Sequence, residues 1–130
     1  MPDALAYNFE HVHVYCTNLA ASKEWFVDKV GAELTDERET RGARAADLKL
    51  GGMTVYLREE LPGEGLGQPG PCRFGTDHMG LSVPDIEGAV AELKGRGVEF
   101  EGEIKQIDPT LRVAFMRGPD MVRVELLERK

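Results

Sequence analysis

Cysteine, positive charge and long apolar runs are all scarce in this sequence, and each shortage excludes a class of protein. Two cysteines among 130 residues cannot supply the disulfide framework of a small secreted domain. No apolar run approaches the roughly 18 residues of a membrane-spanning helix, and the N-terminus lacks a signal-peptide pattern. We therefore expect a cytoplasmic protein with no membrane association.

Positive charge is outnumbered, with 16 lysines and arginines against 23 aspartates and glutamates and a net charge of −7. Nucleic acids and anionic membranes attract basic patches, so we expect neither as a partner. A glycine-rich phosphate loop, a Ser-His-Asp arrangement and zinc-finger spacing are also missing. The length is that of one domain, or of two small halves that share a core.

Two of the three histidines stand at matching positions in two copies of one pattern. His11 and His78 each begin an alternating apolar run, and Asn18 and Asp85 follow seven residues later as candidate helix caps. The differences 78 − 11 and 85 − 18 both equal 67. A repeated element that places histidine twice suggests a shared site, and imidazole is the commonest metal-ligating side chain.

Each copy of the pattern predicts a strand, a helix and three further strands, so the fold class is α+β. In the first half the helix is expected over 19–30, and the strands over 9–16, 33–41, 43–50 and 53–58. In the second half the helix follows Asp85, and the later strands are expected near 98–107, 111–117 and 121–128. Glycine and proline dominate residues 62–71 between them. We expect one domain over 1–130, with modules at about 8–60 and 76–130 and a linker at about 61–75.

Strand parity predicts which side chains face away from the helices. The helix-facing positions are the apolar ones, such as Val12, Val55, Met79 and Val124. The opposite faces carry His11, His13, Tyr15, Tyr56, Arg58, His78, Arg123 and Glu125.

If the two halves curl together, His11, Tyr56, His78 and Glu125 converge. Two imidazoles and one carboxylate suit Fe²⁺, Zn²⁺, Ni²⁺, Mn²⁺ or Co²⁺ and leave positions open for a small substrate. A substrate with two neighbouring oxygens could bind such a metal ion through both of them.

The sequence resembles the vicinal oxygen chelate superfamily, which includes glyoxalase I, methylmalonyl-CoA epimerase, extradiol dioxygenases and the bleomycin-resistance proteins. The matching stretches are His11 to Leu19, Trp25-Phe26, Val30-Gly31, His78 to Ile86, and Gly118 to Leu126. The resemblance implies two βαβββ modules that form a cupped eight-stranded mixed sheet, with the helices on its convex side and a metal in its concavity. It also implies a homodimer, with the cup formed within one chain or shared between two.

By family position, His11, His78 and Glu125 fall on metal-ligand sites. Tyr56 stands where glyoxalase I has a glutamate, so one of the bases of a glyoxalase-type proton shuttle is missing. The remaining triad is that of non-haem Fe²⁺ oxygenases, and we favour a dioxygenase that uses Fe²⁺. A glyoxalase- or epimerase-like lyase or isomerase, working through a metal-bound enediolate with Glu125 as base, is one alternative. A metal-free protein that binds an antibiotic is the other.

The remaining side chains on this face are candidates for contacts with a substrate. His13 and Tyr56 are expected to assist proton transfer. Tyr15 shares their face. Arg58 and Arg123 could each hold an acidic group, or could pair across strands with acidic neighbours instead. Two further features have plain interpretations: the run Asp36-Glu37-Arg38-Glu39 as a solvated hairpin face, and Cys16 as inert core.

Overall fold

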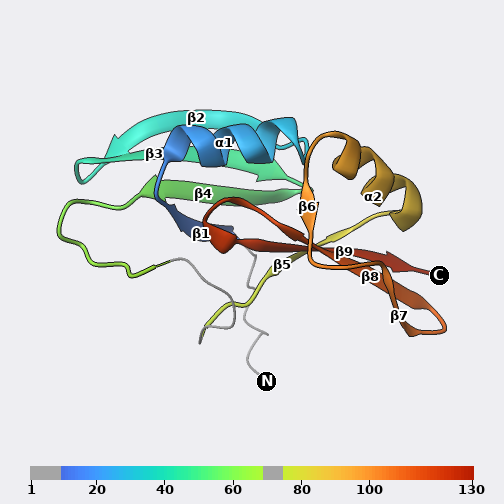
Figure 1. Cartoon of the computed structure of the whole chain (residues 1–130). Coiled ribbons are helices and arrows are strands. Elements are labelled where there is room, and N and C mark those ends of the chain that lie inside the picture. The colour runs from blue at the N-terminus through green and yellow to red at the C-terminus, as the bar shows by residue number, and fades with distance from the viewer. Residues whose placement is uncertain (1–9, 69–74) are drawn as a thin grey trace, which may run out of the picture.

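The computed structural model describes residues 10–68 and 75–130. The first half contains strand β1 (His11–Cys16), helix α1 (Leu19–Asp28) and the strands β2 (Glu33–Thr40), β3 (Ala43–Leu50) and β4 (Met53–Glu59). These strands form a sheet of order β1-β4-β3-β2, in which β1 runs parallel to β4 and the other pairs are antiparallel. Figure 1 shows α1 lying over this sheet.

The second half repeats the arrangement. It contains strand β5 (Met79–Ser82), helix α2 (Ile86–Gly95), strands β6 (Glu99–Phe100), β7 (Lys105–Asp108) and β8 (Leu111–Arg117), a 3-10 turn η1 (Pro119–Met121), and strand β9 (Arg123–Arg129). The sheet order is β5-β9-β8-β6, with β5 parallel to β9 and with β7 also paired to β8. The expected α+β fold with one helix per half is confirmed. No helix within the described ranges is long and apolar enough to cross a membrane.

Both helices begin as the sequence predicts. The Asn18 side chain accepts a hydrogen bond from the backbone N–H of Ala21 at 3.0 Å, and Asp85 accepts one from Gly88 at 3.1 Å. A second carboxylate then stabilises each helix start from the end of a strand. Glu59 of β4 accepts from the N–H of Leu19, and Glu128 of β9 accepts from the N–H of Ile86. These carboxylates compensate the otherwise unpaired N–H groups of a helix N-terminus.

The apolar side chains occupy the helix-facing positions that strand parity assigns to them. Val55 and Leu57 are buried against α1, and Val124 and Leu126 against α2, so two core clusters form. Trp25 packs against both clusters and joins them. The opposite face of β1 leaves its histidines and Tyr15 exposed.

The helix ends tie the two halves together. The Lys29 ammonium donates to the carbonyl of Arg96, and the Arg96 guanidinium donates back to the carbonyls of Asp28 and Lys29 at 3.3 Å each. Lys29 and Arg96 are again 67 residues apart. The repeat therefore builds an approximately reciprocal contact between the ends of α1 and α2.

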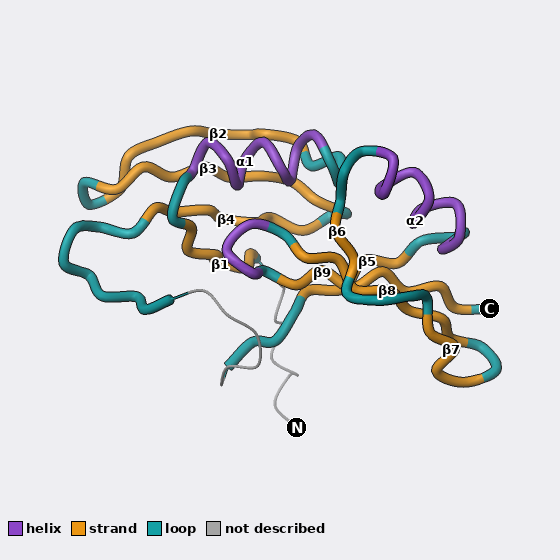
Figure 2. Tube along the Cα trace, viewed as in Figure 1, coloured by secondary structure: helices purple, strands orange, loops and turns teal. Residues whose placement is uncertain are grey.

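The strand hydrogen bonds differ from the expected single eight-stranded sheet. They divide the described strands between a four-stranded and a five-stranded sheet, in which β1 and β5 are edge strands. The strand expected near 98–107 is also broken into β6 and β7, because Gly102 adopts a left-handed φ of +93° between them. Residues 61–68, within the expected linker, form a loop (Figure 2).

Candidate functional site

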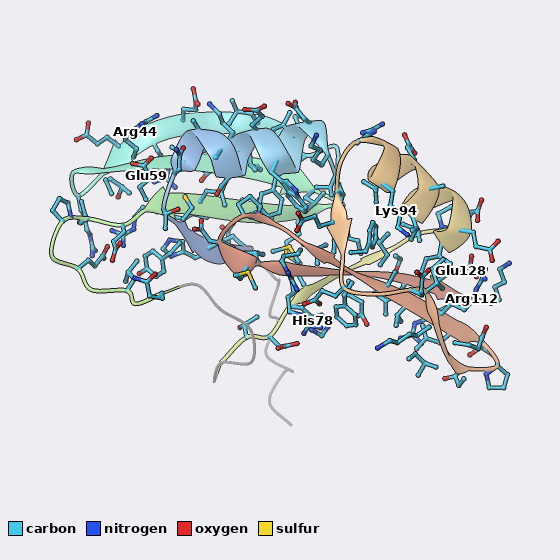
Figure 3. All side chains as sticks on the ribbon, viewed as in Figure 1. Arg44, Glu59, His78, Lys94, Arg112 and Glu128 are labelled. Atoms are coloured by element: carbon cyan, nitrogen blue, oxygen red, sulfur yellow. The ribbon has the colours of Figure 1, made fainter. Side chains whose placement is uncertain are left out.

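His78 and Glu125 meet on the second sheet. His78 immediately precedes β5, and Glu125 lies on the neighbouring strand β9 opposite Gly80. Figure 3 shows His78 on the side of this sheet away from α2. Its Nε2 atom lies 3.3 Å from Oε1 of Glu125, whose side chain is 15% exposed. Two ligands each about 2.1 Å from one metal ion are separated by about 3.0–3.4 Å, so this pair fits adjacent coordination positions.

A series of charged side chains contacts the Nδ1 side of the His78 ring. Its Nδ1 atom lies 2.8 Å from a carboxylate oxygen of Asp77. Arg123 donates through Nη1 to the same oxygen of Asp77 and through Nε to Glu101 at 2.9 Å. The hydrogen bond with His78, followed by the charge of Arg123, lowers the pKa of Asp77 below its ordinary value. Asp77 is therefore an anion that can orient the imidazole.

Phe115 packs against both His78 and Arg123. Its ring stands edge-on to His78 with centroids 5.1 Å apart, and the guanidinium of Arg123 lies 4.2 Å from its centre. The aromatic ring thus touches both the imidazole and the arginine that anchors it, which restricts the rotamers of both.

His11 and Tyr56 form the matching pair on the first sheet. His11 begins β1 and Tyr56 lies on β4, with ring centroids 5.9 Å apart. The Nδ1 atom of His11 lies 2.9 Å from a carboxylate oxygen of Glu10. Glu10 and Asp77 are 67 residues apart. Both repeated histidines, His11 and His78, therefore follow an acidic residue directly, and the Nδ1 atom of each points toward that residue's carboxylate.

An aromatic row continues from Tyr56 along the face of the first sheet. The His13 ring packs edge-on to Tyr56 and tilted against Tyr15, with centroids 4.6 Å apart in both cases. Burial, followed by the nearby charge of Arg58, lowers the pKa of His13. His13 therefore favours its neutral form, in which one ring nitrogen accepts a proton.

An arginine lies at each end of this row. Arg38 lies 4.4 Å from the centre of the Tyr56 ring and donates to its hydroxyl at 3.2 Å and to Asp47 at 3.1 Å. Arg58 lies 4.7 Å from the centre of the Tyr15 ring and is paired with Glu64. Arg58 is thus engaged by an acidic side chain of the loop that follows β4, and not by one on a neighbouring strand.

The structure brings the predicted residues together in two pairs. His78 is with Glu125, and His11 is with Tyr56. Within the described part of the chain, no three histidine, cysteine, aspartate or glutamate side chains are grouped closely enough to hold a metal ion. On the second sheet a single chain therefore supplies two candidate metal ligands, His78 and Glu125, although the predicted triad needs three.

A cleft of about 670 Å³ separates the two edge strands β1 and β5. Its walls are largely apolar, with Val12 and Val14 on one side and Met79 and Leu81 on the other. His13, Tyr15, His78 and Arg123 also reach the cleft. The volume is that of a typical small-molecule site, and it adjoins one side chain of the His78 pair.

Three residues beside the site carry roles that the sequence analysis did not assign. Arg38 lies against Tyr56, although its charged run was interpreted as a solvated hairpin face. Glu10 and Asp77 bind the histidine Nδ1 atoms. Their signal was available, because an acidic residue precedes each repeated histidine at the same spacing of 67.

Comparisons with known proteins agree with the fold. The family model described as the glyoxalase/bleomycin resistance protein/dioxygenase superfamily matches residues 8–126. The protein YaeR of Escherichia coli (strain K12) is 34% identical over 125 residues, covering 92% of this chain and 94% of YaeR. The protein YwkD of Bacillus subtilis (strain 168) is 31% identical over 126 residues, covering 94% of this chain and 97% of YwkD.

Solved structures show the same architecture. A glyoxalase family protein from Enterococcus faecalis is 27% identical with a TM-score of 0.80, covering 93% of this chain and 97% of that one. Two more distant structures show the fold alone. The fosfomycin resistance protein FosX of Listeria monocytogenes, crystallised with Mn(II) and sulfate, has a TM-score of 0.72 at 14% identity, covering 97% and 95%. TnmS3, an antibiotic-binding protein of Streptomyces sp. CB03234, has a TM-score of 0.70 at 19% identity, covering 98% and 100%.

Proposed function

This chain belongs to the glyoxalase/bleomycin resistance protein/dioxygenase superfamily, and from that premise we propose a divalent-metal-dependent enzyme that acts on a small substrate with two neighbouring oxygen atoms. Its metal ligands are His78, Glu125 and a second histidine, His11. The metal ion would supply a Lewis acid that binds and polarises the substrate oxygens.

The observation that carries this proposal is the 3.3 Å approach of His78 Nε2 to Glu125 Oε1. When Nδ1 carries the proton donated to Asp77, Nε2 presents a lone pair to a carboxylate oxygen. Two electron-pair donors that face one point repel each other unless a cation or a proton lies between them. A divalent ion satisfies both atoms at the observed separation.

We propose that a second copy of the chain completes the site. His11 lies on edge strand β1 and His78 beside edge strand β5, and the described chain groups no third donor with His78 and Glu125. In a symmetric dimer that pairs the first sheet of one subunit with the second sheet of the other, His11 of the partner subunit supplies the third ligand. Exposed strand edges and the apolar cleft between them favour such an association.

The side chains beside the metal ligands have separate roles in this proposal. His13, held neutral, accepts a proton at a ring nitrogen. The Tyr56 oxygen accepts a hydrogen bond from Arg38, so the hydroxyl proton of Tyr56 is available to a substrate oxygen. Tyr15 provides an apolar wall, and Arg58 binds an acidic group of the substrate by exchanging Glu64 for it.

Among reactions we favour a dioxygenase that uses Fe²⁺, because two histidines and one carboxylate form the ligand set of non-haem iron oxygenases. A glyoxalase- or epimerase-like lyase or isomerase, with Glu125 as base, is the second candidate. Binding of an antibiotic without chemistry is the third, and the similarity of fold to TnmS3 is the observation that favours it.

Two measurements test the metal site. Protein purified without oxygen should contain one divalent ion per chain by elemental analysis, and each of His11→Ala, His78→Ala and Glu125→Ala should lose it. Wild-type protein that stays metal-free after incubation with Fe²⁺, Ni²⁺ and Zn²⁺ would rule out the enzyme and leave the antibiotic-binding candidate. O₂ uptake with catechol-like substrates supports the dioxygenase, and turnover of methylglyoxal with a thiol supports the lyase.

Mixing variants tests whether the site is shared. Subunits carrying His11→Ala and subunits carrying His78→Ala are each inactive as homodimers. A mixed dimer with a shared site contains one site with both substitutions and one intact site, so unfolding and refolding an equal mixture should restore about a quarter of the metal sites. Restoration of none would show that each site lies within one chain.

A further inference from the structure

We propose that Arg123 is a positioning residue for the metal site: it fixes Asp77 against Nδ1 of His78, so that Nε2 of His78 points at the metal. The proposal rests on the function proposed above and deepens it. It also replaces the substrate-binding role that the sequence suggested for Arg123.

Successive polar contacts connect Glu101 to Arg123, Arg123 to Asp77, and Asp77 to the candidate metal ligand His78. Glu101, between β6 and β7, accepts from Nε of Arg123 at 2.9 Å. Nη1 of Arg123 donates to Asp77, the same oxygen of which lies 2.8 Å from His78 Nδ1. The central carbon of the guanidinium lies 4.2 Å from the centre of the Phe115 ring, which also touches His78. Arg123 thus has two anionic partners and an aromatic surface, an arrangement that only a planar fork of donors can satisfy.

The first half of the repeat provides an internal comparison. His11 pairs with Thr54 across β1 and β4. Thr54 is the counterpart of Arg123, because each lies two residues before one of the matching positions Tyr56 and Glu125, which are 69 residues apart. The hydroxyl of Thr54 accepts from Lys49 at 2.7 Å. Glu10, the counterpart of Asp77, is 85% exposed, whereas Asp77 is 47% exposed. Arg123 therefore holds the carboxylate beside His78 in place, whereas the carboxylate beside His11 is more exposed to solvent.

This asymmetry implies that the Asp77 carboxylate beside His78 contributes more to metal affinity than the Glu10 carboxylate beside His11. Loss of a partner that orients a ligating histidine costs roughly 10–100-fold in metal affinity. We expect Arg123→Gln and Asp77→Asn to weaken Co²⁺ binding about tenfold or more in the full-length protein. Arg123→Lys should lie between them and wild type, because an ammonium reaches Asp77 but cannot hold two acids in one plane.

The test combines a Co²⁺ titration, followed by absorption, with a measurement that needs no metal. Long-range ¹H–¹⁵N NMR of the imidazole rings reports which nitrogen carries the proton, at a pH well above the ordinary histidine pKa of about 6.5. The comparison is made in a Glu125→Ala background, because without a metal ion the Glu125 carboxylate 3.3 Å away favours a proton on Nε2. There His78 should carry the proton on Nδ1, and Arg123→Gln should shift the population toward the Nε2–H tautomer. Arg117→Gln is the matched control, since Arg117 also contacts Glu101, at 3.5 Å, but its side chain is 41% exposed.

A shifted tautomer together with weakened Co²⁺ binding in Arg123→Gln, and neither change in Arg117→Gln, supports the proposal. An unchanged His78 tautomer in folded Arg123→Gln overturns it, as does an equal loss of Co²⁺ affinity in Arg117→Gln. If the wild type binds no Co²⁺ while Arg123→Gln still shifts the tautomer, the positioning of His78 stands and the proposed metal function fails. Circular dichroism of each variant confirms that it is folded.

Discussion

The guanidinium of Arg38 lies over the ring of Tyr56, 4.4 Å from its centre, and donates a hydrogen bond to the Tyr56 hydroxyl at 3.2 Å. The two residues come from different strands, β2 and β4, with β3 between them. Asp47 of β3 binds the same guanidinium at 3.1 Å. The Tyr56 side chain is therefore fixed by an arginine on the outer strand of the sheet.

Arg38→Gln should lower the melting temperature modestly, by roughly 2 °C, because it removes the cation–π contact with Tyr56, the hydrogen bond to its hydroxyl and the ion pair with Asp47. The same substitution in a Tyr56→Phe background should cost less, because no hydroxyl remains to be bonded. Thermal unfolding followed by circular dichroism measures both. Arg44→Gln is the control, since Arg44 is 67% exposed and lies 3.7 Å from Glu59. Equal losses from Arg38→Gln in the two backgrounds would show that the hydroxyl does not contribute.

Glu128 is a buried carboxylate that should make stability depend on pH. The backbone N–H of Ile86, followed by Arg112, lowers the pKa of Glu128 below its ordinary 4.5, and Figure 3 shows Arg112 and Glu128 side by side. A lowered pKa in the folded state means that the carboxylate stabilises the fold fully above pH 4.5 and progressively less as pH falls through the folded value. Glu128→Gln should therefore lower the melting temperature at neutral pH, by about 5 °C, and the difference from wild type should shrink below pH 4.5.

Glu59→Gln is the matched comparison, because Glu59 stabilises the start of α1 as Glu128 stabilises that of α2. Glu59 lacks the close, nearly buried ion pair, since its arginine partner is 3.7 Å away. We expect the smaller loss of stability from Glu59→Gln. A larger loss there, or a wild-type difference for Glu128→Gln that grows on acidification, would contradict the assignment.

Cys16 should be chemically inert in the folded protein. It is 3% exposed, and burial raises the pKa of its thiol from 9.0 to about 11. At neutral pH its thiolate fraction falls about a hundredfold relative to an ordinary thiol. In a Cys72→Ser chain, where Cys16 is the only cysteine, a thiol-specific reagent should react in denaturant and barely at all without it. Rapid labelling of the folded chain would contradict this prediction.

Local structure was predictable because it depends on spacing along the chain. Alternation placed Val12 and Val55 toward α1 and left His11 on the opposite face, and the short polar side chains of Asn18 and Asp85 marked both helix starts. The break between β6 and β7 was missed, because one left-handed glycine, Gly102, interrupts a stretch that alternates like a single strand.

The arrangement of the halves was not predictable by the same means. The alternation of side chains along each strand predicts that His11 and His78 both lie on sheet faces away from the helices. It does not predict how the two sheets are placed relative to one another. That placement depends on long-range contacts such as Trp25 between the two cores and the reciprocal Lys29–Arg96 pair. Arg38 was missed for a related reason: a charge in an exposed run gives no sign of the ring that lies two strands away.

The turn before β9 stores backbone strain that one carboxylate offsets. Asp120 and Met121 both have left-handed φ values, of 56° and 63°, which cost non-glycine residues of the order of 1 kcal/mol each. Asp120 accepts hydrogen bonds from the backbone N–H of Thr17 at 3.0 Å and from its hydroxyl at 2.7 Å. Asp120→Ala loses both bonds and tolerates the left-handed region poorly, so it should destabilise the protein by about 2 kcal/mol in urea unfolding. Asp120→Asn should lose less than half of that, because asparagine accepts a bond from Thr17 and adopts this conformation readily. Equal losses in the two variants would show that the charge of Asp120, and not its bonding geometry, holds the turn.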